Sequence, residues 1–202
     1  MSKSYSRFTM EEITEGLGIV IEQSPGLFAN AEPVSIREFV VEMLRENLPL
    51  AQAIGTEKAK SELLVAPLLT ELRLLTNKEI SLFSGVEFNV VPSQGLKGVC
   101  DFLISKSHSQ YTIDAPVIAV VEAKDDVLRK GLPQCIAEMV AARIFNERRK
   151  NPIATVYGSV TKGSAWNFIK LDGNTAFVDD KEYSIENPHK IMGILLSMVR
   201  ET

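Results

Sequence analysis

The sequence has little cysteine, no long apolar run and no excess of positive charge. Its two cysteines among 202 residues lack the spacing of a metal site and are too few for a disulfide framework, so we expect reduced core thiols. No stretch approaches the roughly 20 apolar residues of a membrane-spanning helix, and no opening segment combines basic residues, an apolar run and a cleavage site. We therefore expect a cytoplasmic protein without membrane contact.

The charge balance is slightly acidic, with a formal net charge of -4. This argues against broad affinity for nucleic acid, because duplex binding relies on neutralised phosphates, and the chain has no recognisable base-reading motif. Arg143, Arg148, Arg149 and Lys150 form a local basic group, which fits a solvated helix end as well as a phosphate contact. The length and the 45% hydrophobic content predict one domain with one sizeable core.

Two apolar segments that predict buried strands carry three charged residues. Asp101 lies in the segment GVCDF, and Glu122 and Lys124 end the segment VIAVVEAK. Unpaired charges on buried strands cost several kcal/mol, so these groups need one another or a bound ion. Residues two apart on a strand face the same side, so Glu122 and Lys124 point together. Asp101 can reach them if its strand pairs alongside.

Capping patterns organise the first part of the chain. Thr9 and Ser35 are each followed three residues later by glutamate, which predicts two helices. We expect residues 1–55 to form an N-terminal helical extension, either a decoration or a dimer arm, and residues 56–202 to form an α/β core. Together they make a single domain.

Alternating helical and strand patterns follow from residue 56 onward. Residues 57–75 predict a core helix capped by Thr56, with a kink or break near Leu63 because Pro67 lacks a backbone donor. Gly85 interrupts the strand expected at 79–90 and is a candidate bulge. Further strands are expected at 154–160, 166–171 and 175–178, and a final helix at 188–199.

A long helix is expected directly after Lys124, capped by Asp125 and Asp126. Gln134 and Glu138 are four residues apart on its surface and share one face. This row fits a solvated polar face. If it faces a cleft instead, Gln134 is placed to orient a water molecule or a substrate phosphate.

An Asp, a variable gap and then Glu-x-Lys, here Asp101, Glu122 and Lys124, resembles the motif of the PD-(D/E)XK nuclease superfamily, also called restriction-endonuclease-like. The order of elements resembles that family's core over about residues 56–170. Gln134 on the following helix resembles the RecB-like branch. The resemblance implies a restriction-endonuclease-like α/β fold, in which a central mixed β-sheet is flanked by helices.

The resemblance also implies a mechanism. Asp101, Glu122 and the Ala123 carbonyl would hold Mg²⁺ or Mn²⁺ through hard oxygen donors. Lys124 and Gln134 would complete the catalytic set. Glu62, on the helix before the sheet, is either an additional site residue or a surface carboxylate. The implied activity is metal-dependent hydrolysis of phosphodiester bonds in nucleic acid, with DNA as the expected partner and a homodimer as the expected assembly.

Two other functions remain open from the sequence. A nuclease-like fold that is catalytically inactive would act as a binding or assembly module, and a metal-dependent hydrolase would act on a small phosphate ester. A second acid-x-Lys match, Asp179 to Lys181, is rejected because it falls at a predicted turn with no acid on a paired strand before it.

Overall fold

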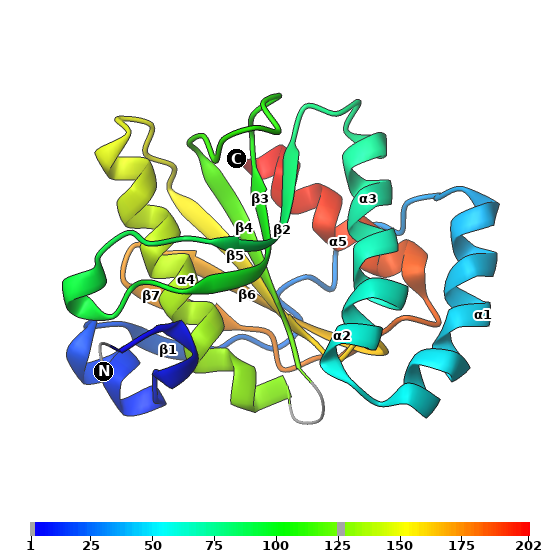
Figure 1. The fold of residues 1–202 in the computed structure, drawn as a ribbon, viewed down its shortest axis with the longest axis horizontal. Coiled ribbons are helices and arrows are strands. Elements are labelled where there is room, and N and C mark those ends of the chain that lie inside the picture. Colours follow the sequence, from blue (N-terminus) through cyan, green and yellow to red (C-terminus); the bar gives the residue numbers. More distant parts are fainter. Residues whose placement is uncertain (1–2, 125–127) are drawn as a thin grey trace.

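The computed structural model describes residues 3–124 and 128–202, and Figure 1 shows the resulting α/β fold. The helices are α1 (Glu38–Ile54), α2 (Glu57–Lys60), α3 (Ala66–Leu75), α4 (Leu128–Arg148) and α5 (Pro188–Glu201). The strands are β1 (Val20–Gln23), β2 (Ser81–Glu87), β3 (Val99–Ser105), β4 (Val117–Ala123), β5 (Thr155–Thr161), β6 (Ala165–Asp172), β7 (Thr175–Val178) and β8 (Tyr183–Ser184). Short 3₁₀ turns lie at Tyr5–Arg7 and Pro92–Gln94. The predicted cap at Asp125 and Asp126 lies outside the described residues.

One mixed sheet organises the molecule. Its strand order is β1-β7-β6-β5-β4-β3-β2, and β8 pairs with β6 outside this path. The pairs β1/β7 and β4/β5 are parallel, and the other pairs are antiparallel. Every residue of β4 is buried, as expected for a strand with neighbours on both sides and helices over both faces. The predicted mixed sheet flanked by helices is confirmed.

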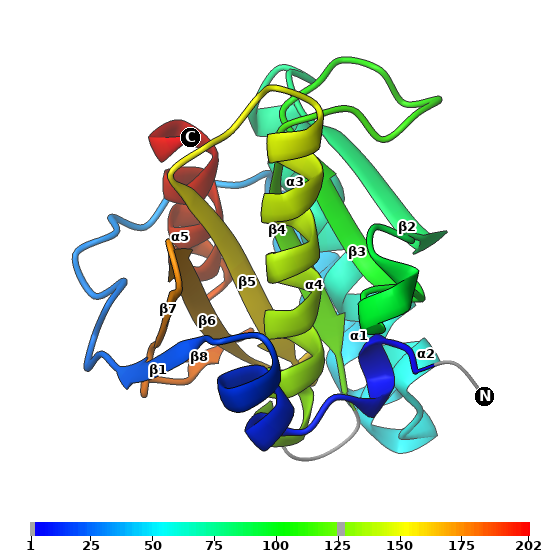
Figure 2. The same ribbon diagram turned by 90° about the vertical axis from the view of Figure 1, so that its left-hand side faces the viewer.

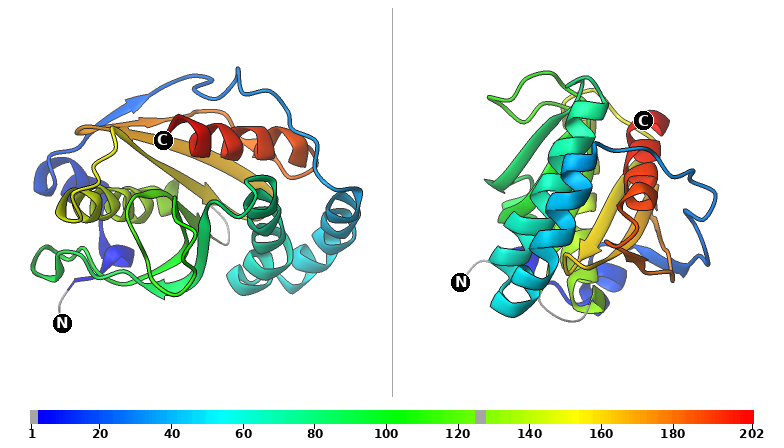
Figure 3. Two further views of the ribbon diagram at one scale, coloured as in Figure 1. Left: turned by 90° about the horizontal axis from the view of Figure 1, so that it is seen from above. Right: turned by 90° about the vertical axis from the view of Figure 1, so that its right-hand side faces the viewer.

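Helices cover the two faces of this sheet unequally. Figures 2 and 3 show α4 lying across one face, while α3 and α5 lie on the other. Each face has its own apolar cluster. The α4 cluster includes Leu103, Val120 and Val160 from the strands, and the opposite cluster includes Phe102 and Val121. The chain thus has two core layers around one sheet, where we expected a single core.

The first 55 residues are not only a helical extension, and this part of the prediction is wrong. Between a π-helical segment at Glu12–Gly16 and α1, β1 joins the edge of the sheet in parallel with β7. Tyr5 and Ile13 are fully buried in the α4 cluster. The strand has only four residues and an exposed pattern, so it gave no periodic signal. The N-terminal segment therefore completes the core.

The predicted irregularity in the 57–75 helix is confirmed. A π-helical segment, Ser61–Val65, separates α2 from α3 directly before Pro67. This widened turn accommodates the missing proline donor without ending the helix. The Thr56 hydroxyl accepts a hydrogen bond from the Ala59 amide at 3.1 Å, as expected of an N-cap.

Gly85 is not a bulge, in contrast to the sequence expectation. The register is the same on both sides of it, with Ser84 paired to Phe102 and Val86 paired to Cys100. Gly85 therefore lies across from Asp101, in a left-handed conformation with φ of 62°. Glycine adopts this conformation without steric cost. On β2, therefore, no side chain stands opposite Asp101.

Asp179 joins the end of β7 to the turn that follows β1. Its carboxylate accepts hydrogen bonds from the amides of Gly26, Phe28 and Lys181 and from the Tyr183 hydroxyl, at 2.9 to 3.2 Å. It is almost fully buried. These four donors show that Asp179 is a structural residue, in agreement with rejecting it as a catalytic one.

Replacing Asp179 with alanine is expected to destabilise the fold by roughly 3 kcal/mol or more, because several buried donors lose their acceptor. Urea unfolding measures this change. The neighbouring Asp180 is exposed, so Asp180→Ala is the matched control and should leave the midpoint nearly unchanged. Equal effects from the two substitutions would contradict this structural role.

Candidate active site

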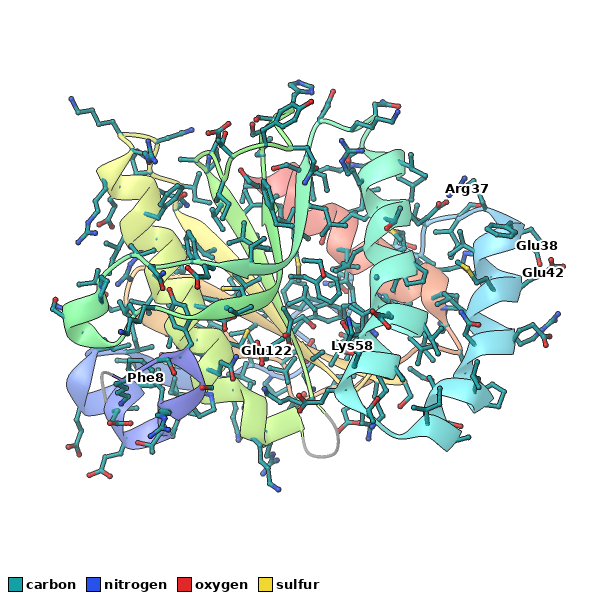
Figure 4. All side chains as sticks on the ribbon, in the orientation of Figure 1. Phe8, Arg37, Glu38, Glu42, Lys58 and Glu122 are labelled. Atoms are coloured by element: carbon teal, nitrogen blue, oxygen red, sulfur yellow. The ribbon has the colours of Figure 1, made fainter. Side chains whose placement is uncertain are left out.

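Glu122 and Lys124 extend toward the same side of the sheet, the side covered by α4. Their side chains form an ion pair, with 2.5 Å between Lys124 Nζ and Glu122 Oε1. Glu122 is only 1% exposed, whereas the Lys124 side chain is 21% exposed. Glu122, labelled in Figure 4, lies in the interior of the protein. Solvent therefore reaches this pair from the lysine side.

Asp101 reaches the same place from β3, which pairs antiparallel with β4 as expected. Its Oδ2 accepts a hydrogen bond from the Ala123 amide at 2.8 Å. Ala123 stands between Glu122 and Lys124 in the chain, so this bond ties Asp101 to the middle of the motif. The structure thus brings together Asp101, Glu122 and Lys124, and Asp101 is only partly buried.

Gln134 and Glu138 of α4 are connected to these three residues by hydrogen bonds. The cluster thus consists of Asp101, Glu122, Lys124, Gln134 and Glu138. Lys124 Nζ donates to Gln134 Oε1 at 3.2 Å, and Gln134 Nε2 donates to Glu138 Oε1 at 3.1 Å. Glu138 is 0% exposed, so this part of α4 is not the solvated polar face that the sequence favoured. We did not predict Glu138 as a site residue. Its spacing of four from Gln134 was the available signal.

Glu122 and Glu138 resist ionisation, because folding raises the pKa of both. Burial and repulsion from Asp101 raise the pKa of Glu122 to about 8, against the opposing effect of Lys124. Burial and the charge of Glu122 raise the pKa of Glu138 well above its usual value. Burial lowers the pKa of Lys124, but Glu122 outweighs it and the net direction is upward. Lys124 is therefore a stable ammonium group.

Gly131 allows α4 to approach the motif closely. A Cβ at this position would lie 2.6 Å from Val160 Cγ1 and 3.0 Å from Lys124 Cγ. Any larger residue would require Val160, the lysine stem or the helix to shift. The glycine therefore sets the distance between α4 and Lys124.

Glu62 is not brought into the cluster. It forms an ion pair with Lys58 along the helix, and its side chain is 59% exposed. Instead, Glu57 in the first turn of α2 interacts electrostatically with both Glu122 and Lys124. Of the two interpretations of Glu62 that the sequence left open, the geometry matches the surface carboxylate. Glu62 is the second residue of the π-helical segment Ser61–Val65, which directly follows α2.

A cleft of about 410 Å³ lies beside the cluster. It combines apolar residues such as Met10 with charged ones of both signs, namely Arg129, Lys162, Asp179, Asp180 and Glu182. None of its described lining residues belongs to the cluster. The two are nevertheless adjacent, because Lys162 follows Thr161, whose carbonyl accepts a 2.7 Å hydrogen bond from the Lys124 amide.

The basic group at the end of α4 is remote from this cluster. Arg148 lies 14 residues after Gln134, which corresponds to roughly 20 Å along a helix. Arg143 donates to the Asn174 side chain at 3.0 Å and Arg148 to the Val90 carbonyl at 2.5 Å. Both arginines therefore serve contacts within the fold.

The oxygen atoms present suit a hard cation in part. Glu122 Oε2 is buried and has no hydrogen-bond partner among the described residues, and Asp101 is partly exposed. Two carboxylates of this kind, with water, match the ligands that Mg²⁺ prefers. Within residues 3–124 and 128–202, no three His, Cys, Asp or Glu side chains form a metal-binding group. A cation here would thus depend on water or substrate oxygens for most of its shell.

No family model, curated protein or solved structure matches the chain. Of the helices in the described part of the chain, none has both the length and the apolar character to cross a bilayer.

Proposed function

We propose that the protein is a metal-dependent nuclease with a restriction-endonuclease-like core. The observation that carries this proposal is the meeting of two carboxylates and one ammonium group at the end of buried strands. Asp101, Glu122 and Lys124 come from two paired strands, and Gln134 joins them from the next helix. This combination pairs hard oxygen ligands with a positive charge for a phosphate.

Asp101, Glu122 and the Ala123 carbonyl would hold Mg²⁺ or Mn²⁺. When bound, the ion would polarise the scissile phosphoryl oxygen and lower the pKa of a water molecule. The unpartnered Glu122 Oε2 supports this assignment, because a buried carboxylate oxygen without a donor carries a desolvation cost that a cation removes. The raised pKa of Glu122 has the same origin.

Lys124 would stabilise the charge that develops on the phosphate. Its ammonium group is held between Glu122 Oε1 and Gln134 Oε1 and remains 21% exposed. A positive charge in a partly buried site acts in a low dielectric, so it stabilises a developing anion more than it would in water. Gln134 orients this ammonium group.

Nucleic acid, with DNA favoured, is the proposed substrate. Arg129 and Lys130 are exposed in the first turn of α4, and Lys162 lies in the turn after β5 next to the motif. Arg129 and Lys162 line the cleft beside the cluster, on a chain whose net charge is acidic. Phosphate contacts of this kind position a nucleic acid without reading its sequence. A homodimer would let two such sites cut both strands of a duplex.

The alternative function is a nuclease-like fold that serves as a binding or assembly module. The observation that favours it is the direct ion pair between Lys124 and Glu122, because the lysine already compensates the buried carboxylate without a cation. In that case, replacing Asp101 would change neither metal binding nor hydrolysis.

The direct test is hydrolysis of labelled single- and double-stranded DNA and RNA with Mg²⁺ or Mn²⁺, with EDTA as the metal-free arm. We expect metal-dependent cleavage of at least one substrate, and a loss of about 100-fold or more in Asp101→Asn. Glu46→Gln, an exposed carboxylate on α1, is the matched control and should retain full activity.

Calorimetric Mn²⁺ binding separates the remaining outcomes. Cleavage of a small phosphate ester, but of no nucleic acid, would favour the third function considered from the sequence. No hydrolysis together with no Mn²⁺ binding would reject the nuclease assignment and favour the binding module.

A further inference from the structure

We propose that Glu138 is a positioning residue of this site, which holds the Gln134 amide so that its oxygen faces Lys124. The inference rests on the proposed nuclease function for its catalytic consequence. It concerns a residue outside the Asp, Glu-x-Lys motif, and it assigns a role to an acid that the proposed hydrolysis does not otherwise use.

Two hydrogen bonds define the direction of the Gln134 amide. Its Nε2 donates to Glu138 Oε1 at 3.1 Å, and its Oε1 accepts from Lys124 Nζ at 3.2 Å. An ammonium group only donates, so a reversed amide would place NH₂ against NH₃⁺. Glu138 supplies the acceptor that keeps the NH₂ end turned away from Lys124.

Among the residues that the structure describes, Gln134 alone forms a hydrogen bond with the Glu138 side chain. The side chain is 0% exposed and lies near Tyr5, Cys100 and Cys135. Tyr5 donates its hydroxyl to the Phe88 carbonyl at 2.6 Å and is thus committed elsewhere. Gln134 is the hydrogen-bond donor that the described structure gives to Glu138.

Fold stability does not account for an acid at this position. Glu138 Oε2 is buried without a hydrogen-bond partner among the described residues. Such an atom carries a desolvation cost that an apolar side chain would avoid. A side chain that lowers the stability of the fold but orients a site residue is typical of a functional site.

The consequence falls on Lys124. Its ammonium group has two side-chain acceptors, one on β4 and one on α4. Without Glu138, Gln134 loses the contact that orients it, and Lys124 keeps only Glu122. The positive charge then has more freedom at the place where a phosphate would bind.

The test compares Glu138→Leu with Glu138→Gln in the full-length protein. For Glu138→Leu, we expect kcat on DNA with Mn²⁺ to fall about 10- to 100-fold, as for the loss of other outer partners of a site, with KM little changed. The urea midpoint of this variant should rise, because an unpartnered buried oxygen is removed. Glu138→Gln keeps an acceptor oxygen and should restore most of kcat. Glu147→Leu, on the exposed side of α4, is the matched control.

A second readout is independent of hydrolysis. In ¹⁵N-lysine-labelled protein, the Lys124 ammonium signal, identified by its loss in Lys124→Arg, should shift in Glu138→Leu and stay unchanged in Glu138→Gln. If Glu138→Leu does not fold, Glu138→Met takes its place.

Different results would overturn the two proposals separately. A faster or unchanged kcat in Glu138→Leu, equal losses in both variants, or a Lys124 signal that Glu138→Leu does not move would each reject the positioning role. If wild-type protein hydrolyses nothing, the nuclease assignment fails, and the Lys124 signal alone decides whether Glu138 orients the lysine through Gln134.

Discussion

Glu122→Gln is expected to abolish hydrolysis and to stabilise the fold at neutral and alkaline pH. Glutamine keeps the shape of the side chain but cannot provide a charged oxygen ligand. In the proposed mechanism, Glu122 is one of two carboxylates that would hold the cation, so its loss should remove Mn²⁺ binding and reduce turnover about 1,000-fold or more. The same substitution removes a buried acid whose ionisation is unfavourable in the folded protein.

The pH dependence of this stabilisation follows from the raised pKa of Glu122. Its pKa is about 8 in the folded protein, against an ordinary value of 4.5. Between these values the folded state keeps a proton that the unfolded state has lost. Stability therefore falls as pH rises from about 4.5 to about 8, by up to about 1.4 kcal/mol per pH unit for one proton. Glutamine does not titrate, so this contribution disappears.

Urea unfolding of both proteins at pH 5, 6, 7 and 8 measures the effect. The advantage of Glu122→Gln should grow across this range, and the slope of wild-type stability against pH should be the steeper one. Folding also raises the pKa of Glu138, so the stability of the variant should still fall somewhat as pH rises. Glu46→Gln should follow wild type at every pH. A constant difference between Glu122→Gln and wild type would show that Glu122 is already ionised in the fold.

Lys124→Ala is expected to slow hydrolysis about 100- to 1,000-fold while Mn²⁺ binding persists. The lysine contributes charge to the phosphate and not a ligand to the cation, so its loss acts on the transition state. Its removal also frees Glu122 Oε1, which it now occupies at 2.5 Å. Binding and turnover should therefore respond in different ways.

Calorimetry and single-turnover cleavage measure these two responses. Because Lys124 lowers the pKa of Glu122, its loss raises that pKa further, and the pH at which Mn²⁺ binding is half-maximal should move upward. Lys106→Ala, an exposed lysine outside the cluster, is the control. Loss of Mn²⁺ binding in Lys124→Ala, or full activity in this variant, would contradict the assigned role.

Much of the sheet was predictable because its strands are local patterns. The apolar run before Glu122 predicts a strand with both faces covered, and β4 is buried throughout. Hydrophobic alternation likewise predicts β5, β6 and β7 close to their observed bounds. The irregularity before Pro67 was predictable because a missing backbone donor is a property of one residue.

Other features had no local signal. β1 is a four-residue edge strand whose pairing partner, β7, follows about 150 residues later in the chain. Gly85 looked like a bulge, but only the shared register of β2 and β3 shows that it faces Asp101. Glu57 and Glu62 lie on one helical stretch, and only the tertiary structure shows that Glu57 interacts with Glu122 and Lys124 while Glu62 is exposed.

The amino-acid sequence by itself determined that two carboxylates and a lysine stand on strands too apolar to leave them unpaired, because strand alternation and desolvation act within a few residues. The tertiary structure alone decided how far that charge network extends. Glu138 became part of it because α4 turns this face toward the sheet, where Gly131 permits close approach. Such packing depends on contacts between distant segments. Its energetic consequence, the burial of an acid away from solvent, exists only once those segments meet.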